Sequence, residues 1–67
     1  MKIDEKKLEL ELARKCMNIS DLVRASNVSR TAIYKILNGR STGTAMAGRI
    51  AKALGVDILD IIEWKKI

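Results

Sequence analysis

The chain has 67 residues, a length that permits one domain with one small hydrophobic core. Its 13 lysine and arginine residues outnumber 8 aspartate and glutamate residues, which gives a formal net charge of +5. A single cysteine excludes an internal disulfide, and the lack of histidine argues against a protein-only zinc site, so we expect no metal or cofactor. No signal-peptide core and no apolar run near the ~20 residues of a membrane helix is found, so we expect a cytoplasmic protein without a membrane span.

The first predicted helix begins after Asp4, which is a suitable N-cap, and runs to about Cys16. Leu8, Leu12 and Cys16 recur every four residues and predict one buried stripe. Leu10 lies on another side of this helix, and two interpretations stay open for it. It covers a second part of the core, or it meets a partner chain.

Residues 18–39 read NISDLVRASNVSRTAIYKILNG and predict two short helices joined by a tight turn. Asn18 with Asp21 predicts a capping box at the first helix, and Ser29 predicts the N-cap of the second. Asn27 lies in the turn, where asparagine tolerates left-handed backbone better than other non-glycine residues. The second helix, at about residues 29–38, is predicted to bury its isoleucines and expose a polar, cationic face.

A loop with two glycines follows, and TAMAGRIAKALG predicts a fourth helix that ends at Gly55. Gly48 weakens this helix by up to about 1 kcal/mol relative to alanine. Two interpretations of Gly48 stay open: close packing against a neighbouring helix, or an unselected surface position.

Asp57 and Asp60 predict the start of a fifth helix, from which Leu59 and Ile62 are expected to reach the core. An apolar surplus remains on that helix and predicts a homodimer contact. An alternative for Trp64 is that its ring closes one side of the small core. The surplus consists of Ile58, Ile61, Trp64 and Ile67.

Charge is distributed unevenly along the chain. No acidic residue lies between Asp21 and Asp57, whereas six lysines and arginines do. A central block of one sign predicts a surface for a polyanion. The plain alternative is a soluble surface that happens to be basic.

The capped helix, tight turn, Ser29 and second helix ending in Asn38-Gly39 resemble the helix-turn-helix of Cro and phage-repressor (Xre-like) DNA-binding regulators. Residues 47–56, AGRIAKALGV, also resemble the fourth helix of that family. Three positions depart from its pattern: Asn27 replaces a glycine, Val23 a small residue and Ser26 an often apolar one. The resemblance covers nearly the whole chain and implies an all-α, lambda-repressor-like bundle of five short helices, with residues 1–67 as a single domain.

The resemblance further implies that the second helix enters the major groove of DNA. Base-reading residues would then be Arg30, Thr31 and Lys35. Tyr34 lies beside them and is expected to contact a base edge or a phosphate; alternatively, its ring lies over its own helix. Capping groups and the following loop are candidates for phosphate contacts, which gives Asn18, Ser20, Ser29, Asn38 and Arg40.

Together these features predict sequence-specific binding of double-stranded DNA by a small transcriptional regulator of a prokaryote or phage. We expect a repressor that binds a near-palindromic operator as a homodimer. The alternative is an antitoxin or partner-binding module whose DNA contact is autoregulatory. One tryptophan, one tyrosine and no phenylalanine leave few stacking platforms for single-stranded RNA. An enzyme is not expected, because no general base, metal-ligand set or phosphate loop is evident.

Overall fold

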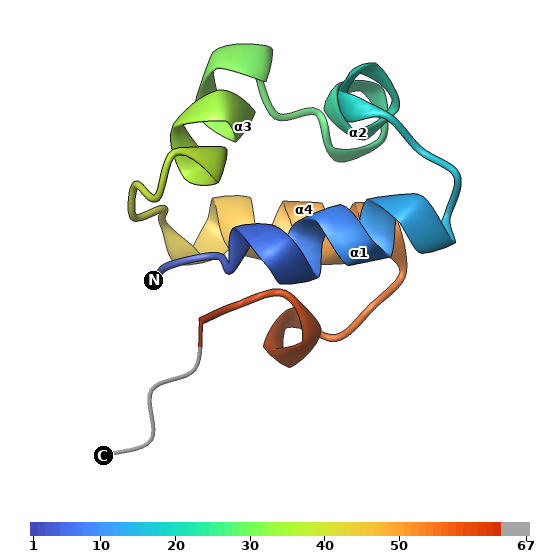
Figure 1. The fold of residues 1–67 in the computed structure, drawn as a ribbon. Coiled ribbons are helices and arrows are strands. Elements are labelled where there is room, and N and C mark those ends of the chain that lie inside the picture. The colour runs from blue at the N-terminus through green and yellow to red at the C-terminus, as the bar shows by residue number, and fades with distance from the viewer. Residues whose placement is uncertain (64–67) are drawn as a thin grey trace.

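Residues 1–63, which the computed structural model describes, form four α-helices and one short 3-10 helix. The bounds are α1 Glu5–Arg14, α2 Ile19–Ser26, α3 Arg30–Leu37, α4 Thr44–Leu54 and η1 Ile58–Asp60. The helices α2 and α3 lie on one side of α1 and α4, and η1 lies on the other (Figure 1). Within the described residues, no helix is both long and apolar enough to cross a membrane.

Helix α1 begins as predicted and ends earlier than predicted. The Asp4 carboxylate accepts hydrogen bonds from the backbone N–H groups of Lys6 and Lys7, at 2.9 and 3.1 Å. The predicted burial of Cys16 is wrong, because Cys16 is exposed and takes left-handed backbone with φ of 54°. That turn lets the Met17 N–H bond to the Leu12 carbonyl at 2.9 Å and brings Met17 against the core in place of Cys16.

The turn between α2 and α3 has the predicted left-handed residue. Asn27 has φ of 56° and ψ of 32°, and its N–H donates to the Val23 carbonyl. Ser26 is buried, yet its hydroxyl donates to the Leu22 carbonyl at 2.6 Å and accepts from the Val28 N–H at 3.3 Å. Since both roles of the hydroxyl are satisfied, a serine is accommodated where the resemblance led us to expect an apolar side chain.

One hydrophobic core joins all the elements. Helix α2 packs against both α3 and α4, and η1 packs against α4. The core is therefore shared between the helix-turn-helix and the two chain ends, and it fixes α3 from one side only. Its buried members are Ile3, Leu8, Leu12, Leu22, Val28, Ile33, Ile36, Ala47, Ile50, Ala51, Leu54, Ile61 and Ile62.

The predicted fifth helix is wrong: within the described residues only the 3-10 turn η1 forms after α4. The capping box of Asp57 and Asp60 is present as predicted, but the chain then leaves the helix to form an antiparallel bridge between Ile62 and Ile3. The Asp4 N–H donates to the Ile61 carbonyl and the Glu63 N–H to the Lys2 carbonyl, both at 2.8 Å. The Ile61 carbonyl and the Glu63 N–H are therefore bonded to the N-terminal segment and do not take part in helical hydrogen bonds.

The bridge also changes which side chains of this segment are buried. Ile61 is fully buried and therefore cannot belong to the predicted partner surface, whereas Leu59 is 54% exposed rather than in the core. Ile62 is buried as expected, and Ile58 is partly buried against the core. Trp64 and Ile67 lie outside the described residues.

A pair of substitutions distinguishes core from surface in this segment. Ile61→Ala should lower the free energy of unfolding by about 2–5 kcal/mol, because it leaves a cavity in the core. Leu59→Ala, on an exposed side chain of the same turn, should change it by less than about 0.5 kcal/mol at protein concentrations where the chain is monomeric. Urea unfolding of both variants measures the difference. Equal losses of unfolding free energy in the two variants would contradict the burial of Ile61 and the exposure of Leu59.

Gly48 does not pack closely against a neighbouring helix. A Cβ atom added at this position would meet no atom within 4 Å, apart from its own helix. Of the two interpretations raised by the sequence, the close-packing one is therefore wrong. The glycine only costs α4 helical stability.

Gly48→Ala should accordingly stabilise the chain by about 0.5–1 kcal/mol, which for a domain of this size raises Tm by roughly 2–8 °C. Gly55→Ala is the matched control, because Gly55 has φ of 68° and a side chain there is strained. Thermal unfolding followed by circular dichroism should show shifts of opposite sign. A lower Tm for Gly48→Ala would show that the helix depends on this glycine.

Candidate nucleic-acid interface

Helix α3 buries one side and exposes the other. Ile33 and Ile36 are 0% and 2% exposed and hold the helix on the core. At 3.6 residues per turn, the exposed positions occupy an arc of about 140°. Arg30 and Lys35 lie at the two edges of that arc. The exposed residues, in order around it, are Arg30, Tyr34, Asn38, Thr31 and Lys35.

An open groove lies along the Lys35 edge of α3. It is bounded by α3, by the loop after it and by the start of α4. Two of its side chains are cations, Lys35 and Arg40, and four carry hydroxyl groups. The structure thus brings together four of the predicted site residues from two elements. The polar side chains lining the groove are Ser29, Thr31, Lys35, Arg40, Ser41 and Thr42.

The groove also includes a feature that the sequence analysis missed. Helix α4 starts with Gly43 as its N-cap, so no side chain accepts a hydrogen bond from its first N–H groups. Gly43 and Met46 line the groove, so this helix start lies at its wall. The signal was available, because a glycine precedes Thr44 where a capping side chain is usual. Unpaired N–H groups at the start of a helix attract anions.

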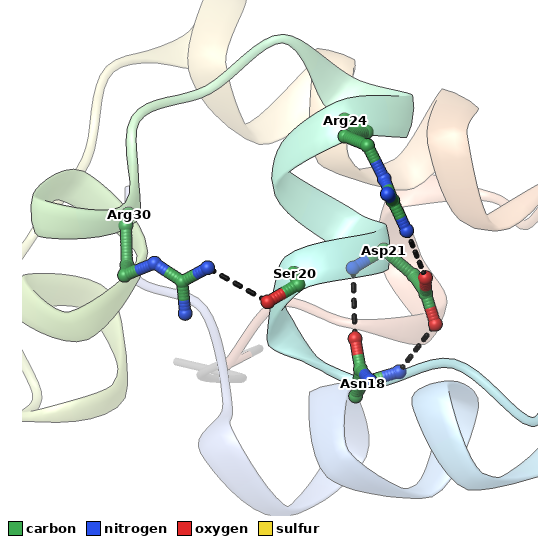
Figure 2. A network of polar contacts seen from close by, with 5 residues as sticks. All are labelled: Asn18, Ser20, Asp21, Arg24 and Arg30. Carbon is green, nitrogen blue, oxygen red and sulfur yellow. Dashed lines mark hydrogen bonds and ion pairs between the residues drawn. The ribbon is translucent and has the colours of Figure 1, made fainter.

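Arg30 points the other way, towards α2. Its Nη2 donates to the Ser20 hydroxyl at 2.7 Å, and Figure 2 shows the guanidinium spanning the space between the two helices. Arg30 is exposed and Ser20 is partly buried. The predicted base-reading residues Arg30, Thr31 and Lys35 therefore share one exposed face. Arg30 lies at one edge of it with Ser20, whereas Thr31 and Lys35 line the groove on the other side with Arg40.

Two predicted phosphate ligands, Asn18 and Ser29, are also N-caps of helices. The Asn18 side chain accepts from the Asp21 N–H at 2.9 Å, and the Asn18 N–H donates to the Asp21 carboxylate at 3.1 Å. The Ser29 hydroxyl accepts from the Ala32 N–H at 3.2 Å. Both caps form as predicted, and the Ser29 hydroxyl proton stays available to a ligand. Asn38 is exposed at the C-cap of α3, and Tyr34 is 47% exposed.

The cations of this face are not used in ion pairs within the described part of the chain. The pairs formed there are Lys2–Glu63, Arg14–Glu11 and Arg24–Asp21. None of these involves Arg30, Lys35 or Arg40. Their charges are therefore available to an anionic ligand. Among residues 1–63, no group of three or more histidine, cysteine or acidic side chains is placed to bind a metal ion.

Asp21 carries the carboxylate nearest to this face in the sequence, and its charge is already engaged. The Asn18 backbone N–H and the Arg24 guanidinium, at 2.7 Å, hydrogen-bond the carboxylate and hold its pKa below the ordinary value of 3.8 (Figure 2). Because the native pKa is lowered, the stability from this site is complete above the ordinary pKa. It is lost as the pH falls through the lowered native pKa.

Asp21→Asn should therefore lower Tm at about pH 7, where the wild-type carboxylate is ionised in both folded and unfolded chains. The difference from wild type should shrink as the pH is lowered below the ordinary aspartate pKa of 3.8. Thermal unfolding over a pH series measures it. A difference in Tm that does not change with pH would mean that the charge of Asp21 contributes nothing.

Comparison with known protein families matches residues 7–66 to the family described as Cro/C1-type HTH DNA-binding domain. Neither a curated protein nor a solved structure matches the chain. The matched region covers all four α-helices except the first two residues of α1.

Proposed function

Because the chain belongs to the Cro/C1-type helix-turn-helix DNA-binding domains, we propose that it is a sequence-specific transcriptional repressor that reads double-stranded DNA with α3. The observation that supports this most is the exposed face of α3, whose side chains are polar or cationic and whose cations are not used in ion pairs within residues 1–63. The opposite face of α3 is held by buried isoleucines, so the exposed face is available to the major groove.

Four side chains of this face would contact the bases. Arg30 can donate two hydrogen bonds to O6 and N7 of a guanine, and Lys35 can donate to the same atoms. Thr31 can hydrogen-bond a base or contact a thymine methyl group. Tyr34 lies between Arg30 and Thr31 on the arc, where its hydroxyl reaches a base edge or a phosphate. Such contacts would supply the sequence preference.

Phosphate contacts would come from the groove beside α3. Arg40 supplies a cation there, and the uncapped start of α4 supplies N–H groups that favour an anion. Ser29 can donate its hydroxyl proton from the same groove. Asn18 and Asn38 lie at the ends of α2 and α3 and would contact flanking phosphates. These contacts hold the register of the protein on the duplex.

We propose that two copies bind one near-palindromic operator, because a single domain with few cationic contacts binds DNA weakly at physiological salt. With Ile61 in the core, the surface that suits a second copy is different from the predicted one. Leu10 and Leu59, 57% and 54% exposed, line one hollow between α1 and η1. As Figure 1 shows, η1 lies on the far side of α1 from α3, so contact there leaves α3 free.

The same two leucines would also suit a different protein, as the alternative of a partner-binding module with autoregulatory DNA binding requires. Sedimentation of the pure chain distinguishes the two. A repressor acting through its own dimer forms a two-chain species alone, whereas the alternative needs its partner.

The division between base and phosphate contacts is tested by two arginine variants on duplexes selected from a random pool. Arg30→Ala should cost about 1–3 kcal/mol of affinity and relax the preference at one base position. Arg40→Ala should weaken binding to selected and random duplexes alike and lower the salt slope by about one. Gel retardation across a salt series measures both effects.

Lys6→Ala provides the matched control, because it removes one exposed cation from α1 rather than from α3 or its groove. It should change affinity much less than Arg40→Ala does. If Arg30→Ala and Arg40→Ala act alike on selected and random DNA, the assignment of roles is wrong. If the chain prefers no duplex at all, the proposed function is wrong.

A further inference from the structure

The contact between Arg30 and Ser20 is the one side-chain hydrogen bond that joins α2 and α3 within residues 1–63. Ser20 lies in the first turn of α2, ten residues before Arg30, and its hydroxyl accepts from Nη2 at 2.7 Å. From the sequence, Ser20 is predicted to contact a phosphate. In the structure the Ser20 oxygen accepts from Arg30, which gives the hydroxyl a role besides the predicted phosphate contact.

The chemistry of the neighbourhood explains why Arg30 meets a hydroxyl rather than a carboxylate. Asp21 follows Ser20 directly, and its carboxylate accepts from the Asn18 N–H and from Arg24. Figure 2 shows Arg24 and Arg30 on different sides of α2, with Asp21 turned towards Arg24. Because Ser20 is neutral, the charge of Arg30 is not cancelled by its partner. The hydroxyl restricts the guanidinium and leaves its charge for DNA.

We propose that Ser20 is a positioning residue that fixes the Arg30 side chain for base reading. A guanidinium has five N–H donors, and the bond to Ser20 uses one of them. Enough donors remain for two hydrogen bonds to a guanine. The conformational entropy of a long, exposed arginine is then partly lost before DNA arrives, so less is lost on binding. This inference rests on the proposed function of α3.

The test is a double-mutant cycle on operator duplexes selected from a random pool. Ser20→Ala should weaken binding of the wild-type chain by about two- to tenfold, the range expected for releasing one ordered side chain. The loss should appear mainly as weaker discrimination at the base position that Arg30→Ala also affects. In an Arg30→Ala background, Ser20→Ala should change affinity by less than about twofold. Ser20→Thr keeps the hydroxyl and should therefore retain most of the affinity that Ser20→Ala loses.

Ser41→Ala is the matched control, since Ser41 lies in the groove on the other edge of the site. Ser41→Ala should change the affinity for DNA by the same factor in the wild-type chain and in the Arg30→Ala variant. If Ser20→Ala instead weakens selected and random duplexes equally, with or without Arg30, Ser20 is a phosphate ligand and the proposal is overturned.

A measurement without DNA separates this inference from the proposed function. In the free protein, NMR relaxation of the Arg30 Nε–Hε group should show lower order in Ser20→Ala than in wild type, and no change in Ser41→Ala. Unchanged order in Ser20→Ala overturns the positioning role, whatever the chain binds. Absence of any duplex preference, with the order lowered as expected, would overturn the proposed function alone.

Discussion

The turn from Ser26 to Val28 is the constraint on which the DNA-facing geometry depends. It sets the angle at which α3 leaves α2, and it does so without the usual glycine. Asn27 takes the left-handed backbone, and the Ser26 hydroxyl bonds on both sides of it, to Leu22 and to Val28. Val28 is 3% exposed and packs into the core directly after the turn. The conformation of each of these three residues has a local cause. Together they fix the direction in which the chain enters α3.

The direction set by this turn places one side of α3 on the core and leaves the other side exposed. Its isoleucines join a core that is otherwise built from α1, α2, α4 and the two chain ends. The arc left over faces solvent and contains no acidic residue. The carboxylate of Asp21, in the first turn of α2, is held by Asn18 and Arg24. Packing therefore places the cations of α3, and local hydrogen bonding keeps them from being neutralised.

Features with local causes could be predicted from the sequence. The caps at Asp4, Asn18 and Ser29, the left-handed Asn27 and the extent of α3 all follow from side chains within four residues of the backbone groups they contact. The exposed residues of α3 follow from its period. Their roles towards DNA stay predictions, since geometry alone does not test them.

Features with distant causes could not be predicted. The bridge between Ile3 and Ile62 joins residues from the two ends of the chain, and no local pattern indicates it. It replaced the expected fifth helix, buried Ile61 and left Leu59 exposed. At the interface, the contact from Arg30 to Ser20 and the approach of the α4 start to Lys35 and Arg40 depend equally on the tertiary fold.

An NMR titration with an operator duplex shows whether α3 and its groove form the DNA-binding surface. We expect the largest changes in amide chemical shift in the first turns of α2 and α3 and in residues 39–44. Amides around Leu10 on α1 should change little. Changes concentrated around Leu10 and Leu59, with α3 unaffected, would contradict this expectation.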